Sequence, residues 1–200
     1  MPSGRTHDRI TLWFLPLVAG STLAVTHHST LTLWVCAGFL WGGLMLGPDL
    51  DTFSLHYRRW GWLRWIWLPY RNSMRHRSPW SHSPIMGTTV RVIYLMAWLS
   101  CLSLIGVATL NEITHMGLSW VELFGFWGQL WHRYSRESIA LFVGLELGAF
   151  SHYTADWLVS SHKRVKSKGW GALWQPKKRT KRSNSANRKK TGQRSTRKRS

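Results

Sequence analysis

Cysteine is scarce in this sequence. The 200 residues contain two, Cys36 and Cys101, and each lies inside an apolar stretch. This excludes the disulfide framework of a small secreted domain and a metal site built from cysteines. Acidic residues are also few, with 8 Asp and Glu against 27 Lys and Arg. Such an excess of positive charge would indicate a nucleic-acid-binding domain only if it were spread over the whole chain.

The positive charge is instead concentrated near the C-terminus. Residues 163–200 contain 16 of the 27 Lys and Arg and no acidic residue, whereas the first 162 residues hold 11 basic and 8 acidic groups. Little in the last segment can be buried, so we expect it to be disordered. The sequence therefore predicts a folded domain over residues 1–165 and a basic tail over residues 166–200.

Long uncharged runs predict a membrane protein. Residues 92–110 are 19 residues without a charge, which as a helix would span the roughly 30 Å of a bilayer's hydrocarbon core. The runs 10–26 and 31–47 are separated by a few residues and predict an antiparallel helical hairpin. A fourth run, 138–150, is apolar except for Glu146, which needs a partner inside a membrane. We expect an all-α integral membrane bundle of about four spans.

Two alternatives to this topology stay open. The chain could be a soluble helical bundle with buried apolar helices. The first run could also be a signal peptide, whose cleavage would remove His7, although Val25-Thr26-His27-His28 is a poor cleavage site.

Tryptophan and arginine suggest how the chain is oriented. Of the 15 tryptophans, several lie in residues 60–70 and 117–131, which we interpret as interfacial segments. A core helix rich in aromatic residues is the alternative for residues 60–70. Placing the N-terminus inside puts the seven arginines of residues 52–91 and the basic tail on the cytoplasmic side. We therefore expect a multi-pass protein of the inner (cytoplasmic) membrane with both termini cytoplasmic.

The same topology gathers metal-ligand residue types at the cytoplasmic helix ends. A histidine and an aspartate four residues apart project from one helix face, and two aspartates that flank one residue repel each other unless a cation compensates. Each motif alone would also suit a solvated surface. The predicted ligands are His7, Asp49, Asp51, His76, His82, His152 and Asp156.

Histidine and aspartate without cysteine suit a divalent metal ion. Zinc is favoured, manganese and iron are alternatives, and the set is large enough for one or two ions. Such ions lower the pKa of bound water and support hydrolysis, with Asp49 or Asp51 as the catalytic general base. Arg75 and Arg77 flank His76 and could clamp a phosphate, or else anchor the loop to anionic lipid.

The order of these motifs resembles that of the predicted membrane-bound metal-dependent hydrolases of bacteria. The matching segments are His7, Gly-Pro-Asp49-Leu-Asp51, His76-Arg-Ser-Pro-Trp-Ser-His82-Ser and Ser-His152-Tyr-Thr-Ala-Asp156. The opening Ser-Gly-Arg-Thr-His-Asp and the Trp-rich middle are more closely similar to a family of uncharacterised bacterial membrane proteins described as metal-binding. The resemblance covers residues 1 to about 165. Ser78 and Ser81 replace the Gly and Thr of the hydrolase pattern.

These features predict a membrane-bound, metal-binding protein that hydrolyses a phosphoester or lipid-related substrate at the cytoplasmic membrane face. A non-catalytic membrane protein with a structural or regulatory metal is the alternative. In a third hypothesis the basic tail is the functional element and binds RNA, DNA or anionic lipid. Membrane lipid is the expected partner in all three.

Overall fold

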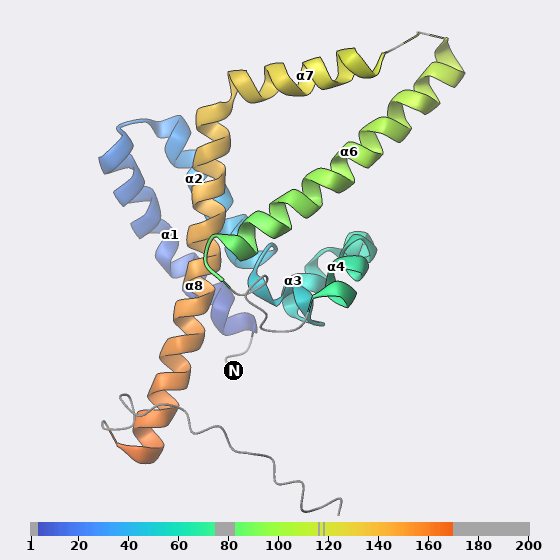
Figure 1. Cartoon of the computed structure of the whole chain (residues 1–200). Helices are drawn as coiled ribbons and strands as arrows, with labels where there is room; N and C mark the ends of the chain where they lie inside the picture. The colour runs from blue at the N-terminus through green and yellow to red at the C-terminus, as the bar shows by residue number, and fades with distance from the viewer. Residues whose placement is uncertain (1–3, 75–82, 116, 118, 170–200) are drawn as a thin grey trace, which may run out of the picture. The chain divides into compact units, whose positions relative to one another are not determined.

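The computed structural model describes residues 4–74, 83–115, 117 and 119–169. In this part of the chain all regular structure is helical and no strand occurs, so the predicted all-α class is confirmed (Figure 1). The chain divides into two compact units, residues 1–160 and 161–200. Every contact discussed below lies within the first unit.

The first two helices form a hairpin. Helix α1 (Gly4–Thr26) and helix α2 (Ser29–Leu44) are joined by His27 and His28 and lie antiparallel, side by side (Figure 1). They approach closely at Gly43, where an added Cβ would lie 2.6 Å from the Thr11 side chain. The predicted hairpin is therefore confirmed. It brings the start of α1 and the end of α2 to the same end of the pair.

Helix α8 (Ser135–Lys168) packs against α2 by direct backbone contact. An added Cβ at Gly144 would lie 2.1 Å from the Val35 carbonyl oxygen, and one at Gly38 would lie 2.2 Å from the Leu141 carbonyl oxygen. Small residues spaced by four are a usual means of close helix packing in membranes. The contact sets the position of α8 beside the end of α2. Its four glycines are Gly38, Gly42, Gly144 and Gly148.

Four short helices follow α2 and surround an aromatic core. They are η1 (Pro48–Asp51), α3 (Leu55–Arg59), η2 (Gly61–Ile66) and α4 (Trp67–Ser73). Trp67 is fully buried and its ring lies 5.2–5.5 Å from those of Trp60, Tyr70 and Tyr94. Trp62, in contrast, is 80% exposed. The segment 60–70 thus combines a buried aromatic face, the alternative considered above, with an exposed one.

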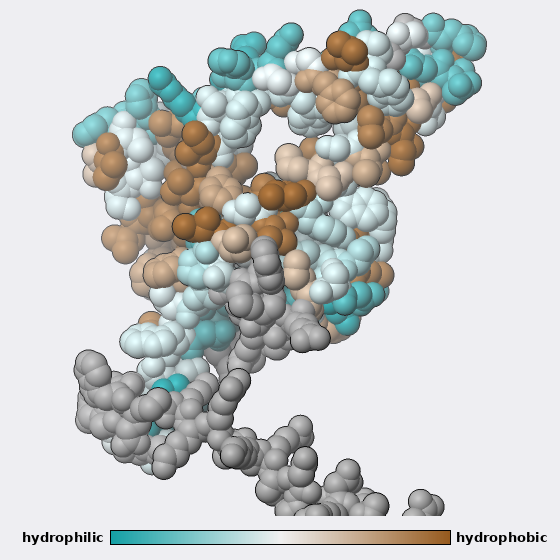
Figure 2. Space-filling view, in the orientation of Figure 1, coloured by the Kyte–Doolittle hydropathy of each residue, from teal (hydrophilic) through white to brown (hydrophobic). Residues whose placement is uncertain are grey.

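Helices α6 (Met86–Thr114) and α7 (Trp120–Arg133) complete the described part of the first unit. Only the first turns of α6 are buried, and no residue of α7 is buried. On the face shown in Figure 2, hydrophobic surface gathers over the region of α2, α8 and α6.

Three stretches in the described part of the chain are long and apolar enough to cross a membrane: Gly4–Thr26, Ser29–Asp51 and Met86–Thr114. The fourth predicted span, residues 138–150, lies within α8 and is not among them. Membrane insertion, with a total of about four spans, therefore stays a prediction.

Candidate metal centre

Five histidine and aspartate side chains from four elements meet beside the end of the α1–α2 hairpin. They form two groups, His7 with His152 and Asp156, and Asp49 with His56 and His152. Within each group the candidate ligand atoms lie within 4.8 Å of one another. His152 belongs to both groups. The structure thus brings together four of the seven predicted ligands and adds His56.

The distances within the centre are those of side chains that face one another. His7 Nε2 lies 3.5 Å from Asp156 Oδ1, and His152 Nε2 lies 3.3 Å from Asp49 Oδ2. The imidazole rings of His7 and His152 stack with centroids 3.8 Å apart at 17°. Neutral imidazoles stack in this way readily, whereas two imidazolium ions would repel each other. The geometry therefore suits neutral rings beside carboxylates.

The histidines are deeply buried and keep nitrogen atoms without hydrogen-bond partners. His7, His56 and His152 are 5%, 4% and 3% exposed. Among the described residues the Nδ1 atom of each has no hydrogen-bond partner, and His152 Nε2 faces Asp49 Oδ2 at 3.3 Å without forming a hydrogen bond of good geometry. An unpaired buried polar atom costs about 1–3 kcal/mol. A divalent cation would engage these lone pairs, so the residues fit a metal ion.

His56 has the orientation expected of a metal ligand. Its Nε2 lies 3.0 Å from the Gly43 carbonyl oxygen, which can only accept, so Nε2 carries the proton and Nδ1 keeps the lone pair. Gly47 makes room for the ring, because a Cβ at that position would lie 2.6 Å from it. Burial, followed by the neighbouring His152, lowers the pKa of His56 to about 4. The imidazole is therefore neutral, the form that binds metal.

The lowered pKa of His56 predicts an acid-sensitive metal-free protein. Between pH 6.5 and pH 4 the unfolded chain binds a proton at this position and the folded chain does not, so acidification favours unfolding. The loss of stability should approach about 3 kcal/mol at pH 4. Thermal unfolding of metal-free protein at pH 7, 5.5 and 4.5 would measure it. The unfolding temperature of His56→Gln should fall less steeply with pH than that of the wild type. An equal fall in both proteins would contradict this explanation.

Arg59 ties together the elements that carry the ligands. Its guanidinium donates hydrogen bonds to both carboxylate oxygens of Asp8 and to the Leu44 carbonyl oxygen. The side chain therefore links α3 to the first turns of α1 and to the end of α2. Asp8 directly follows His7, so this fork holds His7 next to the short helices that carry Asp49 and His56.

Asp51, a predicted ligand and base, belongs to neither group in the described part of the chain. It is 6% exposed and lies in the electrostatic environment of Tyr70. Burial is the main cause that raises the pKa of Tyr70, Arg91 opposes it, and Asp51 adds to it. Arg91 is fully buried and donates to Thr88 Oγ1 at 3.0 Å. The ligand and general-base roles of Asp51 stay predictions.

Glu146 has the partner that the sequence led us to expect, whereas the loop that carries His76 and His82 is not described. Glu146 accepts a hydrogen bond from the backbone N–H of Ile85, which gives this carboxylate a partner at the start of α6. His76 and His82 lie outside the described residues, as do the neighbouring Arg75, Arg77, Ser78 and Ser81. Their roles therefore stay predictions.

His56 was missed by the sequence reasoning because it belongs to none of the four motifs. It stands in the segment Ser-Leu-His56-Tyr-Arg-Arg, whose arginines were used only as evidence for the cytoplasmic side of the membrane. The signal that could have identified it is its place in a short helix directly after the aspartate pair. Ser54 caps that helix by accepting a hydrogen bond from the Tyr57 N–H.

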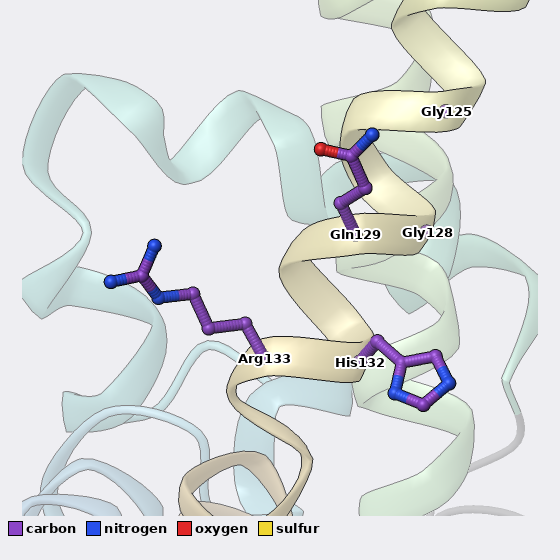
Figure 3. A pocket seen from close by; sticks show the side chains of 5 residues that line it. All are labelled: Gly125, Gly128, Gln129, His132 and Arg133. Atoms are coloured by element: carbon purple, nitrogen blue, oxygen red, sulfur yellow. The ribbon is translucent and has the colours of Figure 1, made fainter.

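A separate hollow of about 540 Å³ lies on the surface of α7. Its lining comes from one helix, with Gln129 and Arg133 on one side and His132 on the other (Figure 3). None of the predicted metal ligands within the described residues lines it. This hollow is therefore distinct from the metal centre.

Comparison with known proteins agrees with this geometry. A curated uncharacterized protein of Aquifex aeolicus (strain VF5) is 42% identical over 59 residues, which are 29% of this chain and 41% of that protein. The chain thus aligns with less than half of this relative's length. No solved structure matches. The model of a family described as "Uncharacterized metal-binding protein" matches residues 2–166, a description that names metal binding and no reaction. The chain belongs to this family of uncharacterized metal-binding proteins.

Proposed function

We propose that this protein is a metal-dependent hydrolase that acts on a phosphoester at the cytoplasmic membrane face. The observation that supports catalysis is the contrast between buried and accessible ligands. The three histidines are almost fully buried, whereas the Asp49 and Asp156 side chains are 25% and 31% exposed. Structural metal sites are closed, while catalytic sites keep a position open to substrate. The carboxylate side of this centre offers that access.

The ligand set favours zinc, with manganese and iron as alternatives. Three imidazoles and two carboxylates match the nitrogen and oxygen donors that zinc uses in hydrolases. The two groups share His152, so the centre suits one ion, or two ions with His152 between them. A bound divalent ion polarises a phosphoryl oxygen and lowers the pKa of a water molecule.

Asp49 is the better placed of the two proposed bases. Its carboxylate is partly accessible and lies against His152, so it can accept a proton from water that enters from the open side. Asp51 is 6% exposed and belongs to neither ligand group among the described residues. In this proposal His7, His152 and Asp156 hold the ion, while Asp49, which faces His152 from the second group, takes up the proton.

The membrane location is supported by the exposure of the apolar helices. None of the most apolar window of Met86–Thr114 is buried, and 6% of that of Gly4–Thr26 is buried. A soluble monomer rarely exposes contiguous apolar surface on that scale. The centre adjoins the N-terminal end of α1 and the C-terminal end of α2, which would place it at a membrane–water boundary. The arginines of residues 52–91 favour the cytoplasmic boundary.

Phosphate release by purified protein in detergent tests the proposal. We expect the zinc- or manganese-loaded protein to hydrolyse p-nitrophenyl phosphate or phosphatidic acid, and chelation to abolish this activity reversibly. Asp49→Asn should lower kcat by a factor of about 100 or more, the scale of a lost general base. Glu112→Gln, at an exposed carboxylate near the end of α6, is the matched control and should behave as wild type.

The outcome separates catalysis from a structural metal. If protein with a full complement of metal released phosphate from both substrates no faster than metal-free protein, the hydrolase proposal would be wrong. The alternative, a non-catalytic membrane protein with a structural or regulatory metal, would then account for the centre.

A further inference from the structure

A cavity of about 740 Å³ lies between α2, α6, α7 and α8. Each helix contributes a large apolar side chain to its wall, including Trp34, Met96, Trp127 and Phe142. The volume lies within the range of about 300–1,000 Å³ that is usual for small-molecule sites. None of the predicted metal ligands that the structure describes lines the cavity, so it is separate from the five side chains of the metal centre.

The chemistry of the wall selects a hydrocarbon. Nearly all of the lining is aliphatic or aromatic, and the polar residues Tyr134, Glu137 and Ser138 lie together where α7 meets α8. An apolar wall offers no hydrogen bonds to a sugar, a nucleotide or an ion, and each of these would lose its hydration on entry. A hydrocarbon chain loses nothing comparable and gains burial of its apolar surface.

The size of the cavity argues against a protein occupant. A helix about 10 Å wide would fill 740 Å³ within roughly 9 Å of its length, which is less than two turns. An extended peptide would place backbone N–H and C=O groups against an apolar wall without partners. Two of the helices that form the wall, α2 and α6, belong to stretches that are apolar enough to cross a membrane. Inside a membrane, lipid molecules would surround these helices.

The inner wall of the cavity is continuous with the segment that carries the metal ligands. Leu145 lines the cavity and also packs in the core cluster with Leu46 and Leu50. In the sequence, Leu46 precedes Asp49 and Leu50 follows it. His152 follows seven residues later on the same helix, about 10 Å along its axis. A chain held in the cavity would therefore have one end within reach of the metal centre.

We propose that this cavity binds the hydrocarbon chain of a lipid phosphoester and presents its phosphate to the metal centre. The inference rests on the proposed hydrolase function and names its substrate class. The cavity holds the chain, and the centre at the end of the hairpin acts on the headgroup.

Photo-crosslinking on metal-free protein tests the chain-binding step independently of turnover. The probe is phosphatidic acid with a diazirine in its acyl chain, incorporated into phosphatidylcholine vesicles with the full-length protein. We expect crosslinks to concentrate on the cavity walls. Met96→Trp, which fills the cavity from α6, should lower labelling of the α8 wall at least tenfold. Leu102→Trp is the matched control on α6, because Leu102 is 51% exposed, as Met96 is 50%, and lies outside the cavity.

Kinetics supply the second readout. Met96→Trp should raise KM for long-chain phosphatidic acid about tenfold and leave hydrolysis of p-nitrophenyl phosphate and bound metal unchanged. Labelling spread evenly over the exposed apolar helices, or unaffected by Met96→Trp, would overturn the proposal. Crosslinks to a second protein chain in the cavity would overturn it as well.

The two proposals can fail separately. Specific labelling of the cavity without phosphate release would leave lipid binding intact and remove the hydrolase function. Phosphate release without specific labelling would leave the hydrolase function intact and remove the lipid-binding role of the cavity.

Discussion

Replacing His152 with alanine is expected to remove bound metal from the protein completely. His152 is the one described side chain that belongs to both ligand groups, and its imidazole stacks on His7 at 3.8 Å. Loss of one imidazole ligand leaves each group with two donors, too few to retain zinc through purification. Metal content by mass spectrometry should fall from at least one ion per chain to none. The dissociation constant for zinc should rise by a factor of 100 or more.

The controls for this prediction are histidines outside the centre. His115 and His132 are exposed, so His115→Ala and His132→Ala should retain the wild-type metal content. Helical content and the elution volume in detergent should be unchanged in His152→Ala, which would separate ligand loss from unfolding. Full metal content in His152→Ala would mean that the ion binds elsewhere.

Leucine in place of Gly144 is expected to disrupt both the fold and the metal centre. A Cβ at Gly144 would lie 2.1 Å from the Val35 carbonyl oxygen and 2.9 Å from the Phe39 nitrogen. Both are backbone atoms, which cannot relieve the clash by a change of rotamer. Helix α8 must therefore move away from α2. Overpacking of this kind typically costs about 1–3 kcal/mol, and more where backbone must shift. Because His152 lies two turns further along α8, zinc affinity should fall together with thermal stability.

Gly106→Leu provides the matched comparison. Gly106 lies in α6 and an added Cβ there would meet nothing within 4 Å, so this variant should unfold and bind zinc as the wild type does. Thermal unfolding in detergent with and without zinc measures both effects. If Gly144→Leu kept the wild-type unfolding temperature and zinc affinity, the close contact between α2 and α8 would not position the centre.

Four of the five side chains that meet at the candidate centre could be singled out from the sequence, while their role as metal ligands stays a prediction. The helical spacing of His152 and Asp156 and the aspartate pair after Gly-Pro were visible in the sequence, and the structure places His152 and Asp156 together with Asp49 and His7. His56 was not predictable in this way. Its proximity depends on the turn after η1 and on the hydrogen bond between its Nε2 and the Gly43 carbonyl oxygen, a contact across thirteen residues.

Tertiary packing explains where the sequence was less informative about the fold. Uncharged runs predicted the helices of the hairpin and α6, since helix length and hydropathy are local properties. Residues 60–70 were interpreted as interfacial, with an aromatic core helix as the alternative. Trp67 is fully buried because Tyr70 and Tyr94 from two helices surround its ring. The contact of α2 with α8 joins segments about one hundred residues apart, and no local pattern specifies which helices pair.

An anomalous difference map from crystals of zinc-loaded protein would locate the bound ion. We expect a zinc peak within about 2.0–2.2 Å of a ring nitrogen of His152 and of at least two further ligands. Those further ligands should come from His7, Asp49, His56 and Asp156. A zinc peak that contacts none of these five side chains, or no peak in protein that carries zinc in solution, would contradict this expectation.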